Sequence, residues 1–173
     1  DKGEEINLYQ ADDGLKDHLQ VAKILKRNNI TGIFFIPTQP LKNKKILNVH
    51  KTHLILGKKK SSLALKELKN LIINQNIIKN KNLFKSYNKI QHLSKIYNNH
   101  VKDEKDKIEF KSIINYLSKD IFLQSKILDK LMKLFKIKKK IKDIYLNNLE
   151  ISKMYNMGMI IGSHGHSHRL LSK

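Results

Sequence analysis

Two short segments of the chain carry residue types that can bind a metal ion or move protons. Asp12 and Asp13 lie in "ADDG", and three histidines alternate in "IIGSHGHSH". Adjacent carboxylates repel each other, so the aspartate pair is costly unless a cation or a shared proton relieves the repulsion. The simpler interpretation of "DDG" is a turn, because Asp-Gly is a common turn dipeptide.

The histidine segment has a spacing that suits metal ligands. His164 and His168 are four residues apart, which brings two imidazoles together on a helical turn or in a compact loop. Two imidazole nitrogens and one aspartate oxygen can hold zinc and leave a fourth position for water. The alternative is a basic loop that collects histidines without binding anything. We expect His166, which alternates with the other two, to point to solvent or to a residue behind the ligands.

Composition restricts the class of protein. The chain of 173 residues is long enough for one domain, or for one domain with an insertion. It contains no cysteine, so any transition metal must be held by histidine and carboxylate. No apolar run approaches the roughly 20 residues of a membrane-spanning helix, and no secretory signal is visible. We expect a cytoplasmic protein, although the sequence begins at Asp1 rather than Met, which leaves an upstream leader open.

The formal net charge of +20 raises the question of a nucleic-acid partner. Only Arg27 and Arg169 are arginines, and lysine is the poorer residue for bidentate recognition of phosphate or guanine. Lysine, asparagine and isoleucine are over-used together along the whole chain, which indicates a compositional bias rather than a basic binding face. We therefore expect no specific nucleic-acid partner. A basic helical nucleic-acid binder stays the alternative, with residues 126–142 as its candidate element.

The first forty residues predict a strand, a helix and a second strand. Apolar residues alternate in "INLYQA" before the aspartates, and a helical pattern runs from Leu15 to Leu25. The apolar run "GIFFIP" is typical of a strand buried on both faces. Two strands joined by an amphipathic helix are usually parallel, so the sequence predicts an α/β fold.

Residues 42–147 predict a helical insertion, after which the first pattern returns. Ser61 or Ser62 can cap one of its helices, and apolar stripes at helical spacing indicate core packing. "NNLEISKMYNMG" predicts a helix that Asn147 or Asn148 caps and Gly158 stops, and "MIIGSH" predicts a short buried strand. The stripes comprise Phe110, Ile113, Ile114 and Leu117, and then Gln124, Ile127, Leu128, Leu131, Leu134 and Phe135.

The aspartates and the histidines thus each follow a predicted strand. Both groups would lie at the carboxyl ends of parallel strands, where ligands gather in α/β folds.

These segments resemble the motifs of a known family. "YQADDGLKDHLQVAKILKRNNITGIFFIP" looks like the opening of the polysaccharide deacetylases, the NodB-homology domain of carbohydrate esterase family 4, which usually open with T-F-D-D-G, a helix and an A-T-F-F strand. "EISKMYNMGMIIGSHGHSH" is similar to their second signature, a helix followed by G-x-E-I-G-x-H-[ST]-x-x-H. The two matches cover about a third of the chain. "ILNVHKTHLILGK" between them resembles short deacetylase-like proteins of bacterial capsule and O-antigen clusters.

The resemblance implies a metal-dependent hydrolase that removes an acetyl group from a carbohydrate. Asp13, His164 and His168 would bind a divalent metal, usually zinc, and Asp12 would be the general base toward a metal-bound water. A metal lowers the pKa of its water, and a carboxylate kept off the metal can take the proton. The implied fold is a partial distorted (β/α) barrel, with residues 1–173 as a single, incomplete domain that carries the helical insertion.

The chain departs from the family pattern in ways that leave an alternative open. Gln10 and Ala11 replace the usual Thr and Phe, which removes no metal ligand. Gly165 replaces a Ser or Thr that usually steadies the loop, so we expect a softer site. The later family signatures, with an arginine that orients the base and a histidine general acid, do not occur before Lys173. The alternative is a catalytically incomplete deacetylase-like protein that binds metal or glycan.

The remaining histidines offer further candidates. His50 and His53 are three residues apart, so they share one face of a helix and could contact substrate or assist at the site. Alternatively, they cap or pack. We expect His18, His92 and His100 to be surface or packing residues.

Overall fold

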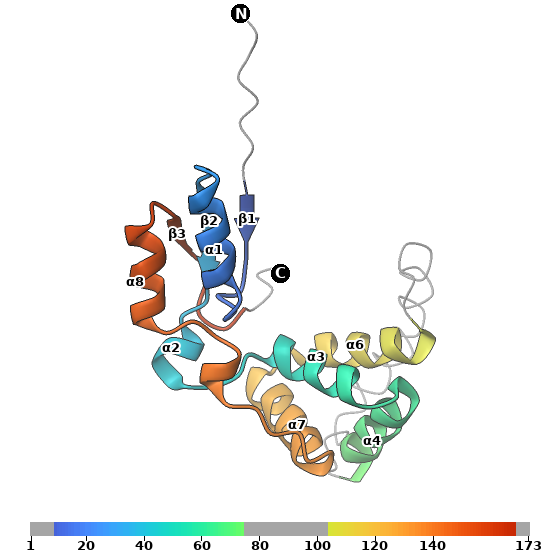
Figure 1. Ribbon diagram of the computed structural model, residues 1–173. Coiled ribbons are helices and arrows are strands. Elements are labelled where there is room, and N and C mark those ends of the chain that lie inside the picture. Colours follow the sequence, from blue (N-terminus) through green and yellow to red (C-terminus); the bar gives the residue numbers. More distant parts are fainter. Residues whose placement is uncertain (1–8, 75–103, 169–173) are drawn as a thin grey trace, which may run out of the picture. The chain divides into compact units, whose positions relative to one another are not determined.

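The computed structural model describes residues 9–74 and 104–168. The chain divides into two compact units (Figure 1). The first unit combines the residues up to Leu47 with those from Lys139 onward, and the second unit comprises residues 48–138. The described residues contain seven α-helices and a three-stranded parallel sheet, which confirms the predicted α/β class.

The sheet belongs to the first unit. Its strands β1 (Tyr9–Ala11), β2 (Gly32–Ile36) and β3 (Ile160–Ser163) lie in the order β1-β2-β3, and both pairs are parallel. Helix α1 (His18–Arg27) connects β1 to β2, and α8 (Asn148–Asn156) precedes β3. The unit also contains the short helix α2 (Gln39–Asn43) after β2 and a 3₁₀ helix, η2 (Ile141–Asp143).

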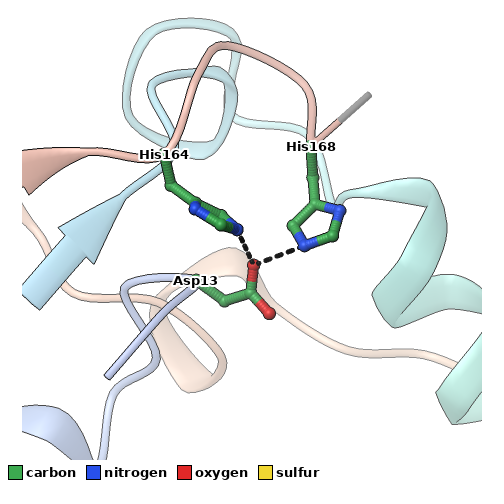
Figure 2. A group of neighbouring side chains, drawn as sticks. All are labelled: Asp13, His164 and His168. Atoms are coloured by element: carbon green, nitrogen blue, oxygen red, sulfur yellow. Dashed lines mark ion pairs between the residues drawn. The ribbon is translucent and has the colours of Figure 1, made fainter. Parts of the chain in front are cut away.

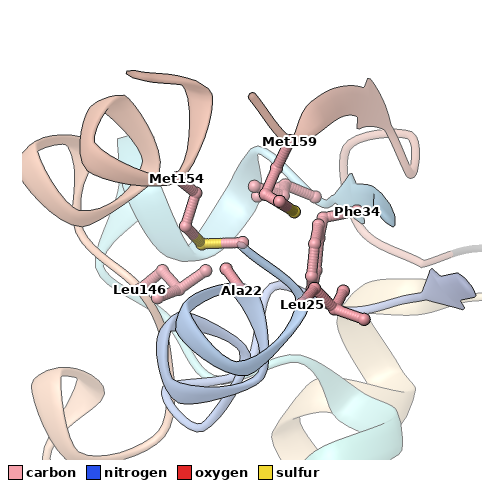
Figure 3. Packing of buried hydrophobic residues seen from close by; sticks show 7 residues of the cluster. Ala22, Leu25, Phe34, Leu146, Met154 and Met159 are labelled. Atoms are coloured by element: carbon pink, nitrogen blue, oxygen red, sulfur yellow. The ribbon is translucent and has the colours of Figure 1, made fainter. Parts of the chain in front are cut away.

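Helices α1 and α8 pack against one face of this sheet and form its core (Figure 3). The apolar stripe of α1 predicts that one side of this helix is buried. The structure confirms this, since Ala22 and Leu25 are buried and Leu19 packs against the same cluster. Leu15 lies outside the helix and instead forms an isolated antiparallel bridge with Tyr145. The cluster consists of Ala22, Leu25, Phe34, Ile36, Leu146, Met154 and Met159.

The opposite face of the sheet is more open than the sequence predicts. Ile33 and Phe35 alternate with the buried residues of β2 and are half-buried, and Ile160 in β3 is 50% exposed. Phe35 lies over Gly162, where an added Cβ would come within 2.6 Å of its ring. The prediction that β2 is buried on both faces is therefore wrong, because the described helices of this unit pack on one face. The short strand β3 was predicted to be buried, but its two end residues are exposed.

The predicted ends of α8 are confirmed. The Asn147 side chain accepts a hydrogen bond from the Glu150 N–H, and the Glu150 side chain accepts one from the Asn147 N–H, at 3.0 Å each. This reciprocal pair is a capping box. Gly158 follows the helix with a φ of 88°, a conformation that glycine adopts without strain.

The second unit contains the helices α3 (Asn48–Lys58), α4 (Ser61–Asn74), α6 (Lys105–Leu117) and α7 (Ile121–Leu134). It lies within the range predicted as a helical insertion. The predicted stripe of α6 is buried throughout, and that of α7 is buried from Gln124 to Leu131. Leu134 is 52% exposed, so its assignment to the core is wrong; Met132 is buried instead. Ser61 begins α4, and its hydroxyl donates a hydrogen bond to Glu104.

Buried polar side chains connect the helices of this second unit. Gln124 accepts a hydrogen bond from the side chain of Asn48 and donates one to the carbonyl of Ile114, both at 2.8 Å. Lys51, whose side chain is 7% exposed, contacts Ser125 and Asp129 on α7.

Among the described helices, none combines the length and the hydropathy needed to cross a bilayer.

Candidate metal centre

Three of the predicted site residues come together at one edge of the sheet. Asp13 lies in the turn after β1, and His164 and His168 lie in the loop after β3, on the two strands that flank β2. One carboxylate oxygen and one ring nitrogen from each histidine all lie within 4.8 Å of one another. Figure 2 shows both rings directed at the same carboxylate oxygen. The three side chains thus form a possible metal-binding triad.

The distances within this triad suit a tetrahedral ion. Oδ1 of Asp13 lies 3.6 Å from Nε2 of His164 and 3.2 Å from Nε2 of His168. With bonds of about 2.0 to 2.1 Å, ligand atoms around a tetrahedral zinc are about 3.3 Å apart. The two distances from Asp13 bracket that value, and the two histidine nitrogens lie within 4.8 Å of each other.

The triad is also accessible. Its side chains are between 21% and 31% exposed, with Asp13 the most buried. The two imidazoles meet edge to face, with ring centroids 4.8 Å apart. A bound cation would therefore keep a coordination position open to water or to a substrate.

The turn after β1 is built to present Asp13. Asp13 and Gly14 both adopt left-handed backbone conformations, with φ values of 75° and 59°. Aspartate tolerates this region better than most residues, but it is still uncommon outside glycine. Gly14 packs so closely on Ile36 that an added Cβ would lie 2.9 Å from its Cγ2 atom. Strained backbone of this kind clusters at functional sites, where the surrounding structure holds it.

Backbone hydrogen bonds hold this turn from its other side. The N–H of Lys16 donates to the carbonyl of Ile144 at 2.8 Å, and the N–H of Leu146 donates to the carbonyl of Gly14 at 3.0 Å. Lys16 also pairs with Glu150 at the start of α8. The segment before α8 thereby fixes the turn that carries Asp13.

The loop after β3 bends at two left-handed residues, Gly165 with a φ of 70° and His168 with a φ of 54°. The N–H of His164 donates to the carbonyl of Ile36 at 3.1 Å, which continues the pairing of β3 with β2. Gly165 suits its position, because a serine or threonine would be strained at this φ. The residue that departs from the family pattern is therefore the one that this loop conformation favours.

Asp12 lies beside the triad but outside it. Its side chain is exposed and accepts a hydrogen bond of 3.4 Å from Nε2 of Gln10. A general-base role for Asp12 requires a carboxylate that is off the metal, and this placement is compatible with it. The role itself stays a prediction.

His50 and His53 lie in α3 of the second unit. His50 is buried and His53 is exposed, and their ring centroids are 6.3 Å apart. They therefore belong to a different compact unit from the triad, and a substrate or accessory role for them stays a prediction. His92 and His100 lie outside the described residues.

His18 packs beside the triad, as predicted for a packing residue. Its ring lies 5.7 Å from that of Phe34. Burial lowers the pKa of His18, and the negative charges of Asp13, Asp17 and Asp12 only partly offset this effect. Among the described residues, its Nδ1 atom has no hydrogen-bond partner. A neutral ring is therefore expected at neutral pH.

Tyr145 is a neighbour of the site that the sequence did not single out. It is 2% exposed, and its hydroxyl accepts a hydrogen bond of 3.0 Å from the N–H of Leu47. Burial raises the pKa of Tyr145 far above its usual value; the hydrogen bond from Leu47 lowers it, and the charge of Asp13 raises it further. The hydroxyl therefore stays protonated. Nothing in "DIYLNN" signals this contact, because it depends on tertiary structure.

The lysine-rich surface of α7 forms a separate feature of the second unit. It surrounds a shallow hollow of about 400 Å³, and Phe122 at its edge is 86% exposed. An acidic residue, Asp129, lies among the lysines, so the surface is mixed in charge. The alternative of a nucleic-acid binder stays a prediction. The hollow is lined by Phe122, Ser125, Lys126, Asp129, Lys130 and Lys133.

Comparison with known proteins adds no relative: no family model, no curated protein and no solved structure matches this chain. The resemblance of the two motifs to those of the polysaccharide deacetylases therefore stays a prediction from the sequence.

Proposed function

We propose that this chain is a metal-dependent hydrolase of the polysaccharide deacetylase type, which removes an acetyl group from a carbohydrate. The observation that carries the proposal is the convergence of Asp13, His164 and His168. These residues come from two distant segments, and they are the three ligands that the two family motifs imply. The three parallel strands would then form part of the distorted barrel of that family.

We further propose that the ion is zinc. Two imidazoles and one carboxylate, with no thiolate in the chain, are a donor set that zinc accepts in catalytic sites. When bound, the cation would polarise the acetyl carbonyl and lower the pKa of a water molecule in its open position. Asp13 would contribute one negative charge to the site and thereby offset part of the charge of the cation.

Asp12 would accept a proton from the attacking water. Its position next to Asp13 in the chain keeps a second carboxylate at the site without adding it to the triad. As the water oxygen adds to the acetyl carbon, Asp12 takes a proton from that water. The bond to the sugar nitrogen or oxygen then breaks as this proton passes from Asp12 to the leaving atom, and the acetic acid that forms ionises to acetate. The products are acetate and a free amine or hydroxyl. The hydrogen bond from Gln10 would restrict how the Asp12 carboxylate turns.

Replacement of Asp12 by asparagine tests this division of roles. Asp12→Asn keeps the shape of the side chain and removes its ability to take a proton. We expect stoichiometric zinc by elemental analysis, and acetate release from acetylated chito-oligosaccharides or acetylated bacterial polysaccharide to fall by about 100-fold or more. Asp17→Asn is the matched control, since Asp17 is an exposed aspartate that makes no side-chain cap to α1.

Three outcomes separate the candidate functions. Unchanged acetate release by Asp12→Asn would exclude Asp12 as the base. Wild-type protein that binds zinc but releases no acetate from any of these substrates would favour the catalytically incomplete, metal- or glycan-binding alternative. Wild-type protein that binds no zinc would contradict both.

A further inference from the structure

The side chain of Thr38 hydrogen-bonds His166 and does not cap its own helix. Thr38 is the N-cap residue of α2, where a threonine hydroxyl usually accepts a hydrogen bond from the first turn of its helix. The Thr38 side chain makes no such bond. Its Oγ1 atom instead lies 2.8 Å from Nδ1 of His166, in the loop between the two ligand histidines. The Thr38 hydroxyl thus contacts the loop after β3 and does not cap α2.

Backbone hydrogen bonds join the same two segments. The N–H of Thr38 donates to the carbonyl of Gly165 at 3.1 Å, and the N–H of Gln39 donates to the carbonyl of His166 at 2.8 Å. The side-chain contact of His166 with Thr38 therefore reinforces a place where the loop is already held against the start of α2.

The backbone of the loop after β3 is not fixed by its own residues, because it bends at Gly165 and His168. Gly165 adopts a left-handed conformation with no atoms near the position that a side chain would take, and His168 is left-handed as well. Rotation about either residue would change the separation of the two ligand nitrogens. With His164 tied to Ile36 at one end of the loop, a restraint at His166 limits where His168 can lie.

We propose that Thr38 and His166 form a clasp that sets the separation of His164 and His168, so that His166 is a positioning residue of the metal centre. This inference rests on the proposed metal site, but not on hydrolysis. Either ring tautomer of His166 allows the contact, since the threonine hydroxyl can donate or accept. Groups that hydrogen-bond a metal ligand directly typically change metal affinity by 10-fold to 100-fold. The exposed contact of Thr38 with His166 acts through the loop backbone instead, so we expect the lower end of that range.

Zinc affinity of the full chain, measured by competition with a chromophoric chelator, tests the clasp. Thr38→Val removes Oγ1 with little change in shape and keeps both backbone hydrogen bonds. We expect Thr38→Val and His166→Ala each to weaken zinc binding by about tenfold. The double variant should be no weaker than the weaker single variant, because both changes remove the same contact. Thr38→Ser and His166→Asn, which keep a polar atom in place, should recover most of the affinity.

Two further measurements separate positioning from general damage. The visible absorption of the Co²⁺-substituted protein reports ligand geometry, and we expect Thr38→Val to change its shape. Thr52→Val is the matched control, because the Thr52 hydroxyl bonds the Asn48 carbonyl within its own helix. We expect this control to keep both the zinc affinity and the cobalt spectrum of the wild type.

Wild-type zinc affinity and an unchanged cobalt spectrum in both Thr38→Val and His166→Ala would overturn the clasp. Wild-type protein that binds no zinc would overturn the clasp together with the metal site. Wild-type protein that binds zinc but releases no acetate would contradict only the hydrolase, and the clasp would still be judged by the variants.

Discussion

Both compact units contain buried or half-buried polar side chains, but the partners of these side chains differ. In the second unit, Gln124 bonds an asparagine on one helix and a backbone carbonyl on another. In the first unit, His164 and His168 both direct a ring nitrogen at the same oxygen of Asp13. Gln124 thus connects helices, whereas Asp13, His164 and His168 surround a common point.

This difference separates structural polar residues from a binding site. A buried amide that satisfies two partners stabilises packing, because each broken contact would leave a buried group without a bond. The three grouped side chains of the triad instead come from loops that follow strands, and the backbone is left-handed at Asp13 and His168. Removal of Gln124 should therefore affect stability, whereas removal of a triad residue should affect metal binding.

The largest effect on stability is expected at Gln124. Gln124→Ala should lower the free energy of unfolding by roughly 2 to 3 kcal/mol, because it leaves the buried Ile114 carbonyl and the half-buried Asn48 amide without this partner and opens a small cavity. Its zinc affinity should equal that of the wild type. Chemical denaturation with and without zinc measures both quantities.

Lys126→Ala is the matched control for this substitution, since Lys126 is exposed on the same helix. We expect a change within about 0.5 kcal/mol. Two results would contradict the distinction between a structural polar residue in the second unit and a binding site in the first. Gln124→Ala could be as stable as the control, or it could lose zinc while it remains folded.

A smaller effect is expected at Glu150, a structural carboxylate of the first unit. Burial raises the pKa of Glu150, but the hydrogen bonds from Lys16 and Asn147 and the charges of Lys16 and Lys153 together bring it below its ordinary value of 4.5. A depressed folded-state pKa stabilises the protein above the unfolded-state pKa, and this contribution is lost as the pH falls through the folded-state value. The relevant window therefore lies below about pH 4.5.

Glu150→Gln keeps the capping box and removes the charge. We expect it to lower the free energy of unfolding by about 1 kcal/mol or less at pH 7, and to match the wild type near pH 3. Denaturant melts across this range measure the difference, and the effect should shrink in a Lys16→Met background. A difference between wild type and variant that does not depend on pH would show that the charge of Glu150 does not contribute in this way.

Local patterns predicted the elements that position the site. The stripe of α1, the Asn147 cap and the Gly158 stop each lie within one stretch of sequence, and each is confirmed. The convergence of Asp13 with the histidines follows from parallel strands, whose carboxyl ends share one edge of the sheet.

Features that depend on tertiary contacts were not predictable. The run "GIFFIP" has the same composition whether one or both faces are covered, so the exposure of Ile33 and Phe35 carries no local signal. Leu134 fits the helical stripe of α7 but lies at the end of that helix and is half exposed. Tyr145 and Thr38 contact partners that are far away in the sequence, and neither residue belongs to a motif.

Zinc content tests the central claim most directly, namely that Asp13, His164 and His168 bind one divalent ion together. Elemental analysis and zinc titration of the wild type should give stoichiometric zinc, and Asp13→Ala and His164→Ala should each abolish it. His53→Ala, which removes an exposed histidine of the second unit, should keep the full metal content. Full retention of zinc by both Asp13→Ala and His164→Ala would contradict the metal centre and the function proposed from it.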